Sequence, residues 1–444
     1  MSGRSAAGHA GWPVFAVLGA GNGGQAMAAH LASQGWDVVL YNRSPGRLRE
    51  LVEHGALRVS GAVDARVPVA YVEGCWGDSD LVGEPARGRP DGVSAPGDGG
   101  RERGRGRLGS SRAAGAGAMS GAGRRTVGAG AASGAGGRLG TVWVTGSLAE
   151  TARARILMVT VPATGHADLG HGLAPYVREG QVLVLNPGRT LGALEMERVL
   201  RAGGCRELPV VAEAQSLLYA ARVVGPGDVH IFSIKHRVPL AALPAWQTPW
   251  VLILLRETFP QFVAAETVLH TSLDNIGAIF HPAPVLLNLA RVEGGEPFDH
   301  YHQGITPAVA RVLEALDGER LSVAAALGIG LPTAREWLRE AYGVDGPDLY
   351  RALKENRAYR GIRAPTDLDT RYLWEDVPTG LVPLASLGEL AGVPTPTMRS
   401  LIHLASLVHG VDYFRHGRTL GRMGLGGLAV ADLLDYVRER REAA

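Results

Sequence analysis

Short apolar runs alternate with helical patterns along the first half of the chain. The runs that predict buried strands are Val14–Leu18, Asp37–Tyr41, Arg155–Val161, Val182–Leu185 and Val210–Ala212. Between them, apolar residues recur at helical spacing in residues 26–35, 45–53, 167–176 and 191–202. Further strands are expected at Leu57–Val59, Val67–Val72, Thr141–Val144, Val229–Ile234 and Val251–Leu255. Strands that alternate with helices in this way predict a parallel sheet covered by helices.

The hydrophobic pattern changes near Phe262–Glu266. Beyond this point the apolar positions follow long amphipathic helical patterns, in residues 305–316, 321–327, 333–342 and 384–390. We therefore expect an α/β N-terminal domain over residues 1–265 and a mainly α-helical C-terminal domain over residues 266–444.

A segment of different composition interrupts the first domain at about residues 74–140. It consists mainly of Gly, Ala, Arg and Ser, with GRERGRGRLG as an example. Such a segment cannot bury enough apolar surface to offset the entropy of ordering, so we predict a disordered insert. Arginine without interleaved aromatic residues is weak evidence for RNA binding.

A glycine-rich turn, GAGNGG, follows the first predicted strand. Gly19 permits a tight turn, Gly21 lets the backbone approach a pyrophosphate, and Gly24 allows the next helix to pack closely on the strand. The N-terminus of that helix offers free N–H groups to phosphate. Because a second strand follows at the expected distance, we predict that the first domain is a Rossmann domain that binds NAD(P).

The residues after the second strand decide which dinucleotide is preferred. An acidic side chain there would accept from the ribose 2′-OH of NAD and repel the 2′-phosphate of NADP. The chain has Asn42, Arg43 and Ser44 instead, with Arg47 one helical turn further. Arginine and serine suit a phosphate, so we predict NADP as the preferred cofactor and NAD as the alternative. The expected cofactor-binding residues are Gly19, Gly21, Asn22, Gly23, Gly24, Asn42, Arg43 and Ser44.

Composition narrows the class of partner. The 45 basic residues nearly balance the 43 acidic ones, so no strong net charge points to nucleic acid or to an anionic membrane. Cys75 and Cys205 lie in no CxxC or CxxH pattern, and we expect neither a disulfide framework nor a metal site. The sequence shows no secretory h-region and no apolar run of membrane-spanning length. We expect a cytoplasmic protein that acts on small molecules.

One histidine of the second half lies in an apolar, proline-bounded segment. His281 is part of NIGAIFHPAPVLLN, at residues 275–288. With a reference pKa near 6.5, an imidazole can move protons in both directions near neutral pH. By itself this pattern fits a core histidine as well as a catalytic one.

Two segments of the second half are more specific, and they carry a family resemblance. They are HPxPxLLN, at His281–Asn288, and EDVPTGLV, at residues 375–382. Together with the glycine turn, they resemble the octopine/nopaline (opine) dehydrogenase family over nearly the whole chain except the insert and the two termini. The resemblance implies a C-terminal domain like that of 6-phosphogluconate dehydrogenase. It also implies an enzyme that joins an amino acid to a 2-oxo acid such as pyruvate through an imine, reduced by NAD(P)H, and that catalyses the reverse oxidation.

The resemblance also implies roles for particular residues. Matching motif to motif, the catalytic histidine and aspartate of the family fall on His281 and Asp376, and the arginine that holds a substrate carboxylate falls on Arg371. In this scheme His281 transfers the proton and Asp376 fixes its tautomer. On weaker grounds, Asn288 orients the substrate or the backbone. The insert is a departure from the family pattern, but it leaves these segments untouched.

Three further residues lie near the ends of predicted strands. We expect Glu213 and Tyr219 to line the cleft between the domains. His166 fits a place near the nicotinamide, and it fits a solvated helix start equally well.

Two other functions remain open at this point. One is an NADP-dependent hydroxy-acid dehydrogenase with a Rossmann and a helical domain, for which Lys354 is the only candidate catalytic lysine, although its surroundings look like an exposed helix. The other is a non-catalytic NADP-binding sensor. The sequence does not fix the oligomeric state, and a homodimer is one assembly that we consider.

Overall fold

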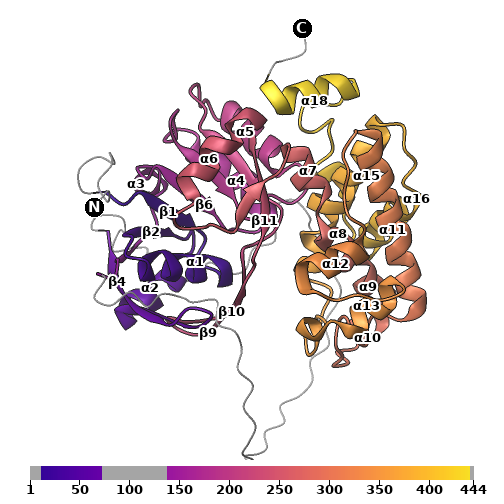
Figure 1. Cartoon of the computed structure of the whole chain (residues 1–444), viewed down its shortest axis with the longest axis horizontal. Helices are drawn as coiled ribbons and strands as arrows, with labels where there is room; N and C mark the ends of the chain where they lie inside the picture. Colours follow the sequence, from indigo (N-terminus) through magenta and orange to yellow (C-terminus); the bar gives the residue numbers. More distant parts are fainter. Residues whose placement is uncertain (1–11, 73–137, 441–444) are drawn as a thin grey trace, which may run out of the picture.

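The structure of the chain is a computed structural model, and it describes residues 12–72 and 138–440. Almost all of the predicted insert at 74–140 lies outside these residues. Figure 1 shows a half with a sheet, formed by the earlier part of the chain, beside a half made of helices. This arrangement confirms the predicted fold class. Within the described residues, no helix is both long and apolar enough to cross a lipid bilayer.

A twelve-stranded sheet forms the core of the first half, in the order β12-β11-β8-β7-β6-β1-β2-β5-β4-β3-β10-β9. Its strands are β1 (Phe15–Leu18), β2 (Val38–Tyr41), β3 (Ala56–Gly61), β4 (Ala65–Tyr71), β5 (Val142–Thr145), β6 (Ile156–Val159), β7 (Val182–Leu185), β8 (Val210–Ala214), β9 (Tyr219–Gly225), β10 (Asp228–Ile234), β11 (Val238–Leu243) and β12 (Phe262–Ala264). Strands β5, β2, β1, β6, β7 and β8 are parallel neighbours. All residues of β1, β2, β6 and β7 are buried, as expected for strands covered on both faces.

Helices cover this sheet. The first half contains α1 (Asn22–Ser33), α2 (Pro45–His54), α3 (Leu148–Thr151), α4 (His166–Leu173), α5 (Gly192–Ala202) and α6 (Thr248–Leu255), with short 3-10 turns η1 (Ala163–Gly165) and η2 (Ala245–Gln247). The carboxyl ends of the parallel strands face the second half, which is the usual position of a ligand in such sheets.

One expectation for this half was wrong, and another was right only in part. The apolar run at Val251–Leu255 belongs to helix α6, which begins at Thr248 with a proline in its first turn. A short apolar run does not distinguish a buried strand from a buried helix. The strand expected at Val229–Ile234 is present as β10 (Asp228–Ile234), and it is parallel to β3 on one side. On its other side it forms an antiparallel hairpin with β9, because the connection between β9 and β10 is too short for a helical crossover.

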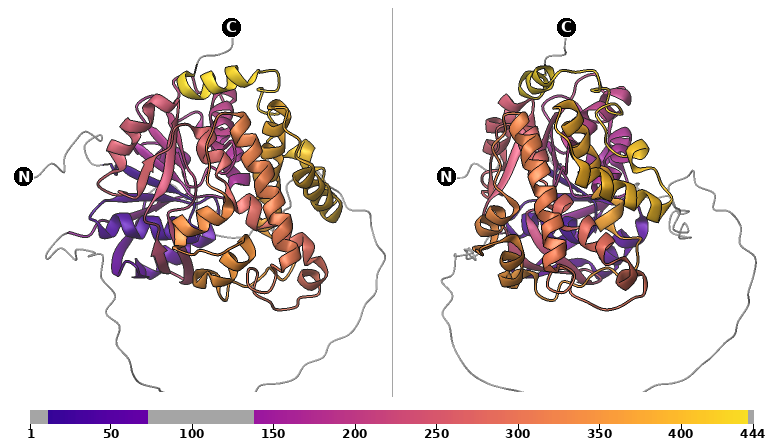
Figure 2. Two further views of the ribbon diagram at one scale, coloured as in Figure 1. Left: turned by 45° about the vertical axis from the view of Figure 1, so that its right-hand side comes forward. Right: turned by 90° about the vertical axis from the view of Figure 1, so that its right-hand side faces the viewer.

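Helices make up the rest of the chain. They are α7 (Val268–Leu273), α8 (Ile276–Phe280), α9 (Pro282–Leu287), α10 (Leu289–Glu293), α11 (Pro307–Ala326), α12 (Ala334–Tyr342), α13 (Leu349–Glu355), α14 (Arg371–Trp374), α15 (Val382–Leu390), α16 (Pro396–His409), α17 (Tyr413–His416) and α18 (Val430–Glu439), with the 3-10 turn η3 (Arg357–Tyr359) and the π-helical segment η4 (Val377–Leu381). The two patterns predicted at 305–316 and 321–327 are parts of one helix, α11. Figure 2 shows α11 along the helical half, while α18 returns to the top of the first half. The boundary at residues 265 and 266 stays a prediction.

Buried polar contacts join the two halves. Glu213, at the end of β8, accepts hydrogen bonds from the hydroxyls of Thr271 and Ser272 in α7, at 2.5 and 2.8 Å. Burial raises the pKa of Glu213 to about 7 despite these bonds. Arg418 lies on the other side of the junction, where its guanidinium bonds Glu195 at 2.7 Å and the carbonyl oxygen of Ala163 at 2.9 Å. These contacts hold the helical half over the carboxyl ends of the strands.

Candidate active site

His281 lies at the junction of two short helices of the second half. Helix α8 ends at Phe280, and Pro282 begins α9, so the histidine occupies the break between them. Its side chain is 19% exposed. Proline at the first helical position fixes the backbone there and needs no N–H donor. The imidazole therefore has a fixed place and still reaches solvent.

Asp376 is the partner of this histidine. Its Oδ2 lies 2.7 Å from Nδ1 of His281, although the two residues are 95 positions apart in the sequence. Asp376 is 1% exposed and immediately precedes η4, and π-helical turns are frequent at functional sites. A carboxylate on Nδ1 favours the tautomer with the proton on Nδ1, which leaves Nε2 as the proton acceptor. Within the described residues, Nε2 of His281 has no protein partner.

A guanidinium from the first half completes the pair. Arg189, in the loop after β7, lies 3.1 Å from Oδ1 of Asp376 and 3.5 Å from Oε1 of Glu375. Its backbone φ of 60° is in the left-handed region, which is uncommon for a side chain other than glycine. Gly277 in α8 makes room, because a Cβ there would lie 2.4 Å from Nη1 of Arg189. The loop after β7 thus places the guanidinium of Arg189 against carboxylates of the helical half.

Glu375 carries a charge inside this cluster. Burial raises the pKa of its carboxyl, but the charges of Arg189 and Arg371 and the hydrogen bond from the Ala163 N–H outweigh that effect and hold the pKa at about 2. Glu375 is therefore ionised at neutral pH and joins the first turn after β6 to the helical half.

Aromatic rings pack against His281. The ring of Tyr372 stacks on it with 4.2 Å between the centroids and 15° between the planes. His300 packs on Tyr372 and donates from Nε2 to the carbonyl oxygen of Phe280 at 3.1 Å. Burial, with the nearby charge of His281, lowers the pKa of His300 to about 3, so this second histidine stays neutral. The stack fixes the plane of the His281 ring.

Arg371 and Asn288 make different kinds of contact. Arg371 is in α14, its side chain is 67% exposed, and its Nε donates to Oε2 of Glu375 at 2.8 Å. No contact of its Nη1 is found within the described residues, so this group can still reach a ligand. Asn288 donates from Nδ2 to the carbonyl oxygens of Pro284 and Gly304, each at 2.8 Å. Its amide thus orients backbone, and a role toward substrate stays a prediction.

The glycine turn has the geometry that a dinucleotide needs. Gly19 has a φ of +113°, and a Cβ on Gly24 would lie 1.7 Å from the carbonyl oxygen of Gly19. Gly21 caps α1 without any side-chain hydrogen bond, so the helix N-terminus is uncovered there. Asn22 accepts a hydrogen bond from the Val223 N–H at 2.9 Å, and Gly23 packs against Leu217. The turn therefore fits a pyrophosphate.

Asn42, Arg43 and Ser44 follow β2 beside this turn. Oδ1 of Asn42 accepts from the Ala20 N–H at 3.0 Å, so Asn42 braces the turn. Arg43 and Ser44 are exposed, and the Ser44 hydroxyl caps no backbone N–H of α2. Nη1 of Arg47 lies 3.8 Å from the position of a Cβ on Gly21. Basic and hydroxyl-bearing side chains are thus exposed beside the glycine turn.

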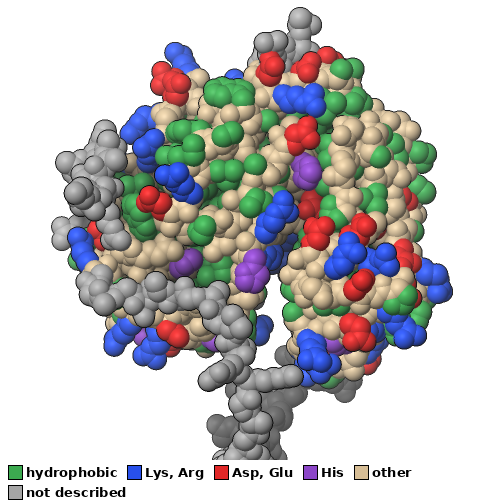
Figure 3. Space-filling model, viewed as in Figure 1, with side chains coloured by type: hydrophobic (Ala, Val, Ile, Leu, Met, Phe, Trp, Pro, Cys, Tyr) green, Lys and Arg blue, Asp and Glu red, His purple; other side chains and the backbone are tan. Residues whose placement is uncertain are grey.

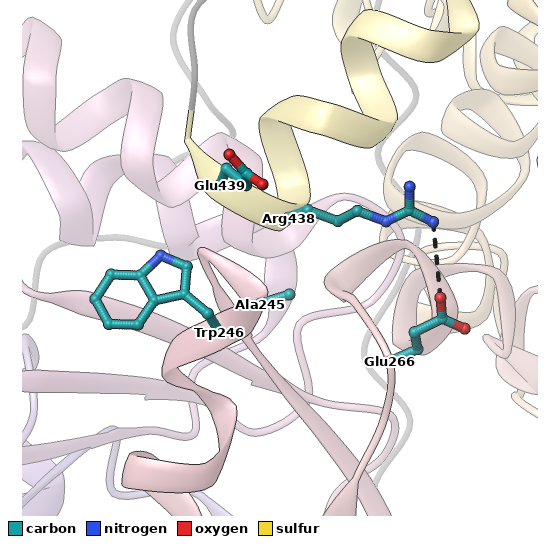
Figure 4. Close-up of a pocket in the computed structure, with 5 residues that line it drawn as sticks. All are labelled: Ala245, Trp246, Glu266, Arg438 and Glu439. Atoms are coloured by element: carbon teal, nitrogen blue, oxygen red, sulfur yellow. Dashed lines mark ion pairs between the residues drawn. The ribbon is translucent and has the colours of Figure 1, made fainter.

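A separate cavity of about 690 Å³ lies at the outer surface, between η2 and α18. Figure 4 shows its lining residues, with the ion pair of 3.7 Å between Arg438 and Glu266. It contains neither His281 nor the glycine turn. Within the described residues, no group of acidic, histidine or cysteine side chains has the arrangement of a metal site.

Comparison with known proteins agrees with this geometry. The family described as NAD/NADP octopine/nopaline dehydrogenase, alpha-helical domain, matches residues 264–409, and the NAD binding domain of 6-phosphogluconate dehydrogenase matches residues 14–77. The opine dehydrogenase of Arthrobacter sp. (strain 1C) is 35% identical over 424 residues, which cover 95% of this chain and 98% of that enzyme. The chain belongs to the opine dehydrogenase family. It is an NAD(P)-binding oxidoreductase of the type that acts on CH–NH groups.

More distant members of the family share the fold of this chain. The octopine dehydrogenase of Pecten maximus is 26% identical over 298 residues, which cover 61% of this chain and 73% of that enzyme. A solved octopine dehydrogenase in complex with NADH and agmatine superposes with a TM-score of 0.66 at 19% identity, and the match covers 97% of this chain and 99% of that one. A yersinopine dehydrogenase with NADP+ bound has a TM-score of 0.58 at 15% identity, and covers 97% of this chain and 98% of that one.

Three residues that we expected near the cleft have buried partners. Glu213 bonds α7, and Tyr219 bonds Nδ1 of His30 at 2.8 Å. His166 is fully buried next to Arg418, and burial lowers its pKa to about 3, so it is not a solvated helix start. Glu213 lies near the carboxyl end of β8, whereas Tyr219 begins β9 and His166 begins α4. A role of Glu213 and Tyr219 in lining the cleft stays a prediction.

Two charged residues of the candidate site were missed in the sequence. Arg189 and Glu375 had local signals, since Arg189 follows a buried parallel strand and Glu375 precedes Asp376 in EDVPTGLV. A polar residue directly after such a strand points to the ligand edge of a sheet. Their mutual pairing depends on tertiary contacts, which local patterns do not contain.

Removing the charge of Asp376 tests the pair. We expect Asp376→Asn to bind NADPH as tightly as the wild type but to lower kcat by roughly 10²- to 10⁴-fold, because the imidazole loses the group that fixes its tautomer. Fluorescence titration of NADPH and steady-state kinetics measure the two effects. Asp367→Asn, on an exposed residue of the same region, is the matched control. A kcat equal to that of the control would contradict the role of Asp376.

Proposed function

We propose that this chain catalyses the NADP(H)-dependent reductive joining of an amino acid to a 2-oxo acid such as pyruvate, and the reverse oxidation. The observation that carries the proposal is the pair of His281 and Asp376, held at 2.7 Å in the helical half that faces the glycine turn. The glycine turn would hold the pyrophosphate of the dinucleotide, whose nicotinamide would supply or accept the hydride. The residues of the second half handle the protons and the carboxylates.

His281 moves the proton in this proposal. With Nδ1 bonded to Asp376, its Nε2 accepts a proton from the amine that attacks the oxo acid and returns one to the oxygen that leaves as water. Asp376 stabilises the imidazolium formed between these steps. Arg189 forms an ion pair with Asp376, so the buried carboxylate has an opposite charge beside it.

Arg371 binds the carboxylate of the oxo acid. Its Nε donates to Glu375, which fixes the direction of the guanidinium and leaves Nη1 for a ligand. Because Arg371 and Asp376 lie on either side of Glu375, an oxo acid held by Arg371 is presented to His281. Tyr372, stacked on His281, closes the apolar side of this space.

NADP is the preferred cofactor in this proposal. The support is the exposed Arg43 and Ser44 after β2, and Arg47 beside Gly21. Arg43 lies 3.5 Å from Asp168, but both side chains are more than 70% exposed, so this ion pair is weak and leaves Arg43 free to bind a phosphate. No acidic side chain occupies the positions directly after β2.

We further propose a cytoplasmic location, where NADPH and 2-oxo acids are present together. A homodimer is the assembly that we propose for the active enzyme. Analytical ultracentrifugation of the full chain tests whether the protein is a homodimer.

Turnover that needs both substrates is the main test of the function. We expect loss of NADPH absorbance only when an amino acid and a 2-oxo acid are both present, because the hydride is delivered to the imine that they form. A pool of amino acids with pyruvate, followed by single amino acids, measures this. Oxidation with the oxo acid alone would support a hydroxy-acid dehydrogenase, and binding of NADPH without turnover of any pair would support a sensor.

Cofactor preference is tested at Arg43. We expect the wild type to have a lower KM for NADPH than for NADH, and Arg43→Asp to raise the KM for NADPH by about 10- to 100-fold, since it replaces a phosphate partner with a repelling carboxylate. The KM for NADH should not rise. Arg66→Asp, at an exposed position of β4, is the control. A wild type that prefers NADH would contradict the NADP assignment.

A further inference from the structure

The ammonium of Lys235 is a partly buried cation at the edge of the cleft. Lys235 follows β10, and its backbone N–H bonds the carbonyl oxygen of Leu218 at 3.0 Å. Its Nζ donates to the hydroxyl of Ser216 at 2.8 Å. Lys235 is one of only two lysines in the chain, and its neighbours His236 and Arg237 are both exposed.

The loop that Lys235 touches lies between the cofactor turn and the catalytic half. On one side of Ser216, the Gln215 amide donates to the carbonyl oxygen of Asp274, just after α7, at 2.8 Å. On the other side, Leu217 packs on Gly23, where a Cβ would lie 2.9 Å from it. Lys235 is thus fixed next to the space between the glycine turn and His281.

Figure 3 shows basic and histidine side chains along the edge of the groove between the two halves. The two cations Arg189 and Lys235 differ in their carboxylate partners. Arg189 has Glu375 and Asp376 within 3.5 Å, whereas within residues 12–72 and 138–440 no carboxylate lies within ion-pair distance of Lys235. Burial and the charge of Arg189 lower the pKa of Lys235 to about 8, although the more distant carboxylate of Asp274 acts in the opposite direction. An anion bound beside Lys235 would favour the charged form of this lysine.

The reaction brings two carboxylates into this space. The oxo acid carries one, for which Arg371 is the expected partner, and the amino acid carries the other, for which the second half offers no assigned partner. An ammonium is a compact charge with three donors, which suits a carboxylate that must be held without a bidentate fork.

We propose that Lys235, supported by Ser216, binds the α-carboxylate of the amino-acid substrate. The inference rests on the proposed function. It means that the loop Gln215–Leu218 and the end of β10 select amines that carry a carboxylate next to the nitrogen, while Arg371 selects the oxo acid. The two carboxylates are then held from opposite halves of the molecule, and the amine nitrogen lies between them at His281.

Removal of the Lys235 charge tests this site. We expect Lys235→Met to raise the KM for the amino acid by about 10- to 100-fold, with the KM for pyruvate and the dissociation constant of NADPH unchanged. Lys235→Arg should restore part of the affinity. Arg237→Met removes an exposed positive charge from the same segment, and it should leave all three constants unchanged. A second measurement compares the amino acid with the amine that lacks its carboxylate: the wild type should prefer the amino acid, and Lys235→Met should lose this preference.

The outcomes separate this site from the function on which it rests. A wild type that turns over, with an unchanged KM for the amino acid in Lys235→Met, overturns the Lys235 site and leaves the proposed function. An equal rise of the KM for the amino acid in Arg237→Met also overturns it, since the effect would then come from the overall positive charge of the region. A weaker NADPH complex in Lys235→Met overturns it too, since the lysine would then act on the cofactor. A wild type without turnover of any amino acid and oxo acid overturns the proposed function itself.

Discussion

The active site depends on one buried guanidinium. Arg189, 15% exposed, lies between two carboxylates, Glu375 and Asp376, that are at most 3% exposed. Removing two carboxylates from water costs several kcal/mol for each ion unless an opposite charge is close. Arg189 comes from the sheet half and the carboxylates from the helical half, so the ion pairs that stabilise the charges also fix the two halves against each other. Arg189 thus neutralises, from the sheet half, the carboxylate that bonds His281 in the helical half.

The ion pairs of Arg189 also determine which groups the two carboxylates can orient. Asp376 uses one oxygen for Arg189 and the other for His281, and Glu375 is shared between Arg189, Arg371 and a backbone N–H. The proton-transfer group and the expected carboxylate partner are therefore oriented by neighbouring carboxylates of one segment. The sheet half contributes the glycine turn and Lys235. In our proposal each half thus supplies one cation for a substrate carboxylate, Lys235 from the sheet half and Arg371 from the helical half.

Local patterns predicted the features that are local in the structure. The glycine turn was found because strand, turn and helix are contiguous, and its close contact between Gly24 and Gly19 involves no distant residue. The pairing of His281 with Asp376 spans 95 residues and came only from the family resemblance. Arg189 was missed because its role depends on a left-handed backbone and on the space at Gly277. Helix α6 was taken for a strand because periodicity does not separate short buried helices from buried strands.

The tautomer of His281 shows whether Asp376 holds the imidazole ready to accept a proton at Nε2. Nitrogen NMR on the full-length enzyme, with the signal assigned by its loss in His281→Gln, reports which ring nitrogen carries the proton. We expect a proton on Nδ1, bonded to Asp376, and a free Nε2 in the neutral ring. A proton on Nε2, or an Nδ1 signal that does not respond to Asp376→Asn, would contradict it.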